Sequence, residues 1–424
     1  MPSLTRESPT NEAAQPALIQ AGGADNPRTY RAMVWRQFRR NHIALGGLVL
    51  IAALFAVAIA APVIASNKPI LMRWNGRLSS PMLREIFAPS QEVPERFLER
   101  AFNYALVLSV ASLVILVPLW LAVRPRARRA AVLGWSAAAL AVVCLVPFFL
   151  VQSRLDETDY RGLAQEAGGK PGSGDWFLMA PLPYGPFEQL RSESYSAPSD
   201  AHPMGTDSSG RDVLVRVIHG ARVSLSVGFL SVGVAVIIGL FVGAISAYHG
   251  GWVDLLVQRL VEVVICFPTF LLILTIMAFM DKRSIFNVML VIGLTGWTGV
   301  TRLVRGQMLS ENAKDYVVAA QALGASSWRI MFRHLLPNSI APVFVAITFG
   351  VAGAILTESG LSFLGFGVSP PTASWGELLN QALTWPTGYW WLTVWPGVMI
   401  FITVTVYNLV GEGLRDALDP RLKI

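Results

Sequence analysis

A loop bracketed by glycines, Gly205-Thr-Asp-Ser-Ser-Gly-Arg-Asp212, has almost the spacing of a phosphate-binding loop. Such a loop needs a lysine after its second glycine to reach phosphate, and then a Ser or Thr hydroxyl to hold magnesium. Here Arg211 replaces the lysine, and Asp212 places a negative charge where the hydroxyl should be. We therefore predict a turn that leads into a short interfacial helix, and no ATP-binding site in this chain.

Glu358 is an acidic residue within an apolar stretch, and a charge inside a membrane is by default a candidate functional group. It could couple transport to protons, but a proton relay normally needs more than one buried ionisable group. Glu262 is the only other acid well placed, and it lies near the end of its stretch. We expect Glu358 to tie its helix to the following loop, and an ion-coupled secondary transporter stays the alternative.

No group of side chains has the pattern of a catalytic or metal centre. The five histidines are scattered without metal-ligand spacing, and no cluster of Asp, Glu, His or Ser converges near one membrane face. We therefore predict no catalytic residue, no metal and no enzyme activity in this chain.

The segment from Asp315 to Asn338 is the most informative one, because its apolar residues recur at helical spacing. Gly324 can end a first helix in the left-handed conformation, and Ser326 or Ser327 can cap a second. Pro337 ends the second helix or starts the next span. One face of the first helix holds Tyr316, Ala319, Ala320 and Leu323, and one stripe of the second holds Trp328, Met331, Phe332 and Leu335, with Arg329 and Arg333 on the other side. This pair is either an amphipathic hairpin lying on anionic lipid or a docking element for a partner protein.

The composition places these motifs in a membrane protein. The chain has 424 residues, of which 53% are hydrophobic and 14% charged, and its mean hydropathy is +0.50. The chain has a net charge of +7, and its basic residues lie between apolar runs. This placement indicates membrane topology and not nucleic-acid binding. Since a bilayer needs about 20 apolar residues per helix, we predict an all-α polytopic fold with about eight transmembrane helices. The predicted spans are 43–65, 102–123, 131–151, 222–247, 259–280, 286–304, 340–358 and 393–411.

Basic residues flanking the spans predict the orientation, since Lys and Arg concentrate in cytoplasmic segments. Arg36, Arg39 and Arg40 precede the first span, and four arginines lie between positions 124 and 129. Both termini are therefore expected in the cytoplasm, and the acidic segment 152–221 outside. The predicted regions are a cytoplasmic tail (1–42, with 1–29 disordered), a first span (43–65), an insertion (66–201), a core (202–411) with a cytoplasmic loop at 311–338, and a cytoplasmic tail (412–424).

Small and aromatic residues mark two further surfaces. Gly228, Gly233, Gly239 and Gly243 lie in one span, where small residues permit close helix packing, and we expect an interface with another subunit there. Trp385, Trp390, Trp391 and Trp395 are expected to form an aromatic belt at the outer membrane interface.

The segment 315–338 resembles a loop shared by the permeases of ABC importers, with an EAA motif, a glycine and a final Leu-Pro. Val318-Ala319-Ala320, Gly324 and Leu336-Pro337 stand at these positions, whereas Val318 and His334 depart from the pattern. Five more segments are similar to the C-type permease of dipeptide and oligopeptide importers: His202–Leu214, His219–Ser224, Leu356–Gly365, Pro370–Gly376 and Gly413–Leu422.

The resemblance implies a type I importer permease core in the bacterial inner membrane, carrying peptides or peptide-like solutes. It also implies a second homologous permease, two ATP-binding subunits that hold ATP and magnesium, and an extracytoplasmic solute-binding protein. The loop would dock on an ATPase subunit through Tyr316, Ala319, Ala320, Gly324, Trp328, Arg329, Phe332, Arg333, Leu336 and Pro337. The solute stays open, with nickel chelates or another non-peptide solute as alternatives. Because related permeases have about six spans, the pair 102–123 and 131–151 is an inserted helical hairpin, which we expect to pack against the partner permease.

Overall fold

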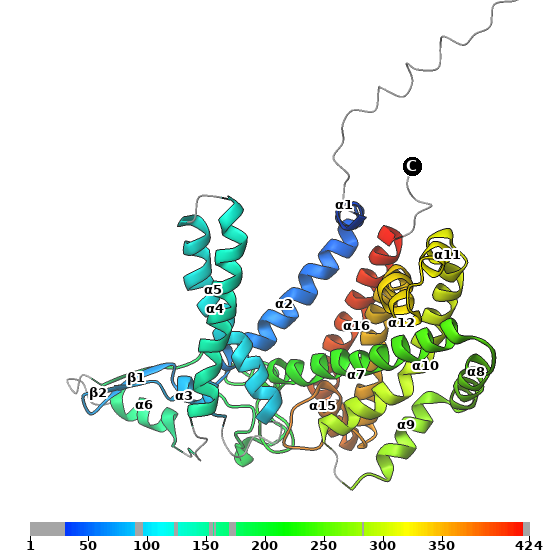
Figure 1. Cartoon of the computed structure of the whole chain (residues 1–424). Coiled ribbons are helices and arrows are strands. Elements are labelled where there is room, and N and C mark those ends of the chain that lie inside the picture. Colours follow the sequence, from blue (N-terminus) through cyan, green and yellow to red (C-terminus); the bar gives the residue numbers. More distant parts are fainter. Residues whose placement is uncertain are drawn as a thin grey trace, which may run out of the picture.

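The computed structural model describes residues 30–89, 96–122, 126–151, 156, 158–168, 175–281 and 284–418. The tail predicted to be disordered, 1–29, lies outside this range. Helices of ten or more residues dominate the described chain, as the all-α polytopic class requires (Figure 1). They are α1 (Tyr30–Arg40), α2 (His42–Ile64), α4 (Arg96–Ala122), α5 (Arg126–Leu150), α7 (Val213–His249), α8 (Gly251–Cys266), α9 (Thr269–Ala278), α10 (Ile285–Asn312), α14 (Ala341–Phe363) and α16 (Trp390–Leu418).

Within the described residues, six helices are long and apolar enough to cross a membrane, or seven if α8 and α9 count as one span. Gly134–Leu150 of α5 adds a shorter apolar segment, which agrees approximately with the predicted eight. Several helices run past their predicted ends: α7 begins at Val213 because Asp212 caps it, accepting a hydrogen bond from the Val215 amide. Likewise α16 continues to Leu418, so the predicted C-terminal tail begins as helix.

The span predicted at 259–280 is bent and divided between two helices. Helices α8 and α9 meet at an angle of 79°. The bend falls at Phe267 and Pro268, where a proline disfavours helical geometry in the residue before it.

A small antiparallel sheet at one end of the molecule departs from a purely helical fold. Its strand order is β2 (Arg77–Ser79), β1 (Leu71–Trp74) and β3 (Trp176–Leu178). Asn75 and Gly76 join β1 to β2 with positive φ at both positions, the turn that matches the twist of paired strands. Beside it lie α3 (Pro81–Phe87) and α6 (Tyr160–Gly168), so the predicted insertion contains folded structure besides its two spans.

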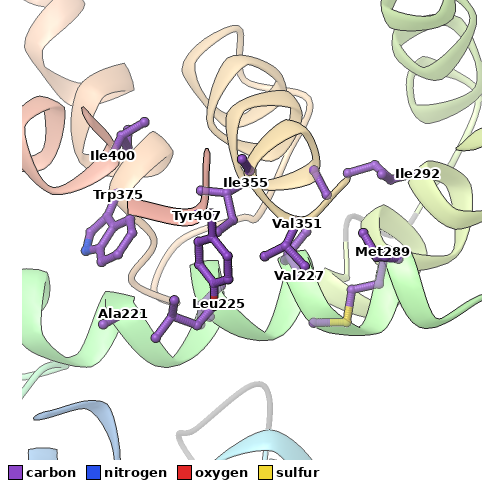
Figure 2. Close-up of a cluster of buried hydrophobic side chains, with 14 of the residues drawn as sticks. Ala221, Leu225, Val227, Met289, Ile292, Val351, Ile355, Trp375, Ile400 and Tyr407 are labelled. Atoms are coloured by element: carbon purple, nitrogen blue, oxygen red, sulfur yellow. The ribbon is translucent and has the colours of Figure 1, made fainter. Parts of the chain in front are cut away.

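The core gathers along α7, which runs across the lower part of the molecule in Figure 1. Figure 2 shows α7 contributing Ala221, Leu225 and Val227, with side chains from α10, α14 and α16 packed above it. The glycines of α7 permit this approach: a Cβ on Gly228 would lie 2.9 Å from Val351, and one on Gly239 would lie 2.5 Å from Val300. Gly228 and Gly239 therefore pack α7 against α14 and α10 of the same chain, whereas Gly233 has open space beside it, so the interface with another subunit stays a prediction.

Candidate functional site

Residues 313–340 join α10 to α14, and we call them the connecting segment. It contains α11 (Asp315–Ala322), a three-residue helical turn α12 (Ser327–Arg329), a π-helical stretch η2 (Ile330–Leu335) and α13 (Leu336–Ser339). In Figure 1, α11 and α12 lie at the end of the molecule that also carries α1 and the last turn of α16. The predicted pair of helices is thus present, although the second is largely π-helical. A π-helical turn is rare and is often found at functional sites.

The turn between the two helices is a Schellman motif centred on Gly324. Gly324 has φ of +72°, its amide donates to the Gln321 carbonyl at 2.9 Å, and the Ala325 amide donates to the Ala320 carbonyl at 3.1 Å. These two bonds satisfy carbonyls that the end of α11 would leave unpaired. The predicted glycine stop is confirmed. Ser326 stands at the predicted cap position of the second helix, but its side chain makes no capping bond.

One face of the connecting segment is buried against the membrane-spanning helices. Val317, Ile330, Met331 and Leu335 pack with Val304 and Met308 of α10, Ala244 and Ala247 of α7, and Val343 of α14. Val317 and Leu335 are fully buried. Burial of this kind stabilises the segment against α7, α10 and α14 in one closely packed cluster.

The opposite face is exposed and apolar at its tip. Leu323 is 88% exposed and Trp328 is 65% exposed, and Val318 is also exposed. Arg329 and Arg333 flank this tip and are exposed. An exposed face of this kind can meet either a lipid surface or a partner protein.

The stripe predicted on the second helix therefore divides in two. Met331 and Leu335 face inward, whereas Trp328 faces outward and lies over Phe332, with ring centroids 4.0 Å apart. On the first helix the buried residue is Val317. Leu323 was expected on the same face as Tyr316 and Ala320, but only those two pack against the buried cluster. Of the other predicted residues, Ala319 and Pro337 are exposed, and Leu336 is half-buried.

Polar contacts hold the base of the connecting segment. The Tyr316 hydroxyl donates to Glu311 at 3.0 Å and accepts from the Asn338 amide at 3.3 Å, which links the start of the segment to its end. Burial, and then the Glu311 carboxylate, raise the pKa of Tyr316, so the phenol keeps its proton and stays a donor. Lys314 adds an ion pair to Glu311 at 2.6 Å.

A second anchor, which the sequence did not reveal, lies beside the segment. Asp254 near the start of α8 receives two hydrogen bonds from Arg305 of α10, at 2.5 and 2.6 Å. A bidentate pair fixes orientation as well as distance. Within α8, Arg259 pairs with Glu262 at 2.7 Å, but this ion pair is exposed and adds little stability.

The loop that resembles a phosphate-binding loop lies at the opposite end of the molecule. The carboxylate of Asp207 accepts hydrogen bonds from the amides of Ser209 at 2.8 Å and Arg211 at 3.0 Å, so these amides already have an anion. The predicted turn is confirmed, but it leads directly into α7 and not into a short interfacial helix.

A buried ion network surrounds this turn. Arg216 lies between Asp207 at 3.2 Å and Glu377 of α15 (Trp375–Gln381) at 2.6 Å, and all three side chains are buried. The network ties the first turn of α7 to α15. Trp391 is buried here and donates to the Thr206 carbonyl, so it is not part of an exposed aromatic belt.

Glu358 is fully buried in α14 and accepts a hydrogen bond from Ser362 at 2.7 Å. The Ser362 hydroxyl in turn accepts from the Val368 amide in the loop that follows. This is the helix-to-loop tie expected from the sequence. Among the residues that the structure describes, no three His, Cys, Asp or Glu side chains group as metal ligands would.

Comparison with known proteins identifies the family. Residues 235–424 match the family model of the binding-protein-dependent transport system inner membrane component. Residues 29–81 match that of the N-terminal TM domain of oligopeptide transport permease C.

Curated relatives agree with these matches. The dipeptide transport system permease protein DppC of Alkalihalophilus pseudofirmus is 39% identical over 232 residues, covering 55% of this chain and 76% of the relative. The oligopeptide transport system permease protein OppC of Bacillus subtilis is 39% identical over 226 residues, covering 53% and 74%. The glutathione transport system permease protein GsiD of Pectobacterium atrosepticum is 39% identical, covering 53% and 75%.

A chain in a solved structure of the MetNI methionine ABC transporter is 16% identical, with a TM-score of 0.38, covering 46% of this chain and 95% of that chain. The sequence matches and the apolar helices together describe a multi-pass protein of the inner membrane. The chain belongs to the binding-protein-dependent ABC transport permeases, in the C-type branch of the dipeptide and oligopeptide transporters.

Proposed function

We propose that this chain forms half of a translocation pathway for peptides and receives the energy for transport through the connecting segment. A second, homologous permease would supply the other half. Two ATPase subunits would bind ATP and magnesium, and an extracytoplasmic binding protein would deliver the solute. The relatives named for dipeptide, oligopeptide and glutathione transport support a peptide solute over a nickel chelate.

The observation that carries the proposal is the division of the connecting segment into two faces. Its tip, Leu323 and Trp328, offers apolar surface to a partner, while its base is packed into α7, α10 and α14. A subunit that grips the tip can therefore move two membrane-spanning helices. A hairpin lying on lipid would need no such rigid attachment to the helices on either side.

The sidedness follows from the same assignment. If the tip meets an ATPase subunit, its end of the molecule faces the cytoplasm, together with α1 and the end of α16 (Figure 1). The sheet and α15 then lie outside, where a binding protein would dock.

The alternative of ion coupling finds less support. Ser362 donates to one carboxylate oxygen of Glu358, and Glu262 forms an exposed pair with Arg259. Neither arrangement provides the chain of buried ionisable groups that a proton relay uses.

The test is reconstitution of the complex with its second permease, ATPase subunits and binding protein, followed by ATP-dependent peptide uptake. Leu323→Gln removes apolar surface at the tip without opening a cavity, because the side chain is almost wholly exposed. The expected result is loss of the ATPase subunits from the purified complex and loss of uptake. For retention of the ATPase subunits, Leu78→Gln is the matched control, since Leu78 is also exposed but lies in β2 at the other end. Normal subunit retention in the Leu323 variant would refute the docking assignment.

The extra spans remain a predicted contact for the partner permease. Helices α4 and α5 pack on each other, α4 contacts α2 and α7, and outward apolar side chains include Leu113, Trp135 and Phe149. Deletion of residues 102–151 is expected to reduce recovery of the second permease with this chain. Undiminished recovery would refute the contact.

A further inference from the structure

A cavity of about 310 Å³ lies among α7, α9, α10 and α14. This volume is at the lower end of the range for small-molecule sites. The polar side chains around it all carry hydroxyl groups: Ser231, Thr269, Thr295 and Thr357. Four glycines and several small apolar residues complete the lining, so the backbones come close to the cavity.

The hydroxyl of Ser231 has no hydrogen-bond partner among the described residues, although the residue is only 1% exposed. A buried hydroxyl loses the bonds that water would give, and native proteins seldom leave one unpaired. Ser231 stands on α7 near the centre of a membrane span, where a partner must come from protein, from water or from a solute. This hydroxyl is an observation independent of the glycine-rich lining, and it points to an occupant.

The cavity is also linked to the connecting segment. α10 supplies Thr295 and Gly299, and α14 supplies Gly353 and Thr357. The connecting segment joins these same two helices and is packed against both. The cavity and the connecting segment are therefore built on the same two helices.

We infer that this cavity is where the chain contacts the main chain of a transported peptide, an inference that rests on the proposed function. Peptide amides offer donors and acceptors at regular intervals, and a hydroxyl can serve as either. Thr295 donates to the Val291 carbonyl at 3.0 Å and Thr357 to the Gly353 carbonyl at 2.8 Å, so their oxygens are left as acceptors for peptide N–H groups. Ser231 keeps its proton to donate to a peptide carbonyl.

The lining also predicts how this half of the pathway treats peptide side chains. No residue that lines the cavity, within the described part of the chain, carries a charge. A fixed charge in a low-dielectric site would strongly favour solutes of opposite charge. The cavity therefore does not select peptides by the sign of their charge, and such selection belongs to other parts of the pathway.

Gly353 allows a direct test, because a Cβ added there meets nothing within 4 Å. In the reconstituted complex, Gly353→Asp is compared with the uncharged Gly353→Asn, using one lysine-containing and one glutamate-containing dipeptide. We expect the Asp variant to raise the ratio of lysine-peptide to glutamate-peptide uptake above that of the Asn variant. Equal ratios in two assembled complexes would overturn the inference.

A labelling experiment covers the case in which the Asp variant fails to assemble. Gly353→Cys is made in a chain with Cys144→Ser and Cys266→Ser, the only native cysteines. The expected result is modification by a membrane-impermeant thiol reagent, slowed by an excess of transported dipeptide. Gly397→Cys on α16 is the control, since it also has open space but does not line the cavity.

Modification by a lipid-soluble reagent alone would mean that the cavity faces acyl chains, and would overturn the inference. Modification that the dipeptide does not slow would also overturn it. If the native complex takes up no peptide, the proposed function fails and the peptide assignment fails with it. If native uptake is normal but neither readout responds, only the cavity assignment is wrong.

Discussion

Gly324 provides a graded test of whether the shape of the connecting segment matters for docking. Its φ of +72° lies in the left-handed region, and a Cβ added there would meet nothing within 4 Å. Gly324→Ala therefore introduces backbone strain without a steric clash. The left-handed conformation costs an L-residue roughly 1–2 kcal/mol. Asn tolerates it better, because its short polar side chain can bond locally.

Gly324→Pro is expected to be the most damaging of the three variants. Proline fixes φ near −65° and lacks the N–H that donates to the Gln321 carbonyl. The Schellman turn is then lost, together with the angle between α11 and the second helix. The tip would no longer present Leu323 and Trp328 as one surface.

The assay is the dissociation constant between the reconstituted permease pair and fluorescent ATPase subunits. If docking needs the native turn, the Ala variant must adopt the strained conformation when it binds. The strain energy then reduces the binding free energy, and the affinity should fall roughly 5- to 30-fold. The expected order of affinity is native, then Asn, then Ala, then Pro. Gly306→Ala on α10 also enters open space, but in a helix, and should bind as the native chain does. Unchanged affinity for both Ala and Pro, or tighter binding by Ala than by Asn, would refute the reasoning.

Three further changes probe the supports of the fold. Leu335→Ala should lower stability by about 2–5 kcal/mol because the side chain is fully buried in the cluster beneath the connecting segment, and thermal unfolding of the purified chain measures this. Asp254→Asn should cost less, about 1 kcal/mol, since its bidentate pair with Arg305 is partly exposed; an equal drop in the two melting temperatures would contradict this. Arg222→Met should cost about 3–5 kcal/mol because Arg222 is buried and binds Glu99 of α4 and the Ala58 carbonyl of α2. Adding Glu99→Gln to that variant should recover part of the loss, and a purely additive double variant would count against the pair.

The sequence predicted those parts of the connecting segment that depend on local chemistry. A glycine after a periodic run ends a helix because it adopts positive φ without strain, and Gly324 does this. The inward face could not be predicted, because Val317 and Tyr316 are neighbours and tertiary packing decides which one is buried. The bend at Pro268 has a local cause in the proline, but the apolar run on both sides of it predicted one span and not two helices. The ion pair between Asp254 and Arg305 joins residues far apart in the chain, so no local sequence pattern predicts it.

The buried base and the exposed tip of the connecting segment have separable roles in the proposed mechanism. A tip that binds an ATPase subunit transmits force only if the segment resists deformation. Close packing of Val317 and Leu335 supplies that resistance, because packed interiors have low compressibility. Tyr316 adds to it by linking the start of the segment to Asn338 at its end. Damage at Leu323 should therefore prevent docking, whereas damage at Leu335 should leave docking possible and weaken its effect on α10 and α14. If a Leu335 variant takes up less peptide while its ATPase subunits stay bound, the connecting segment transmits force as well as attaching the subunit.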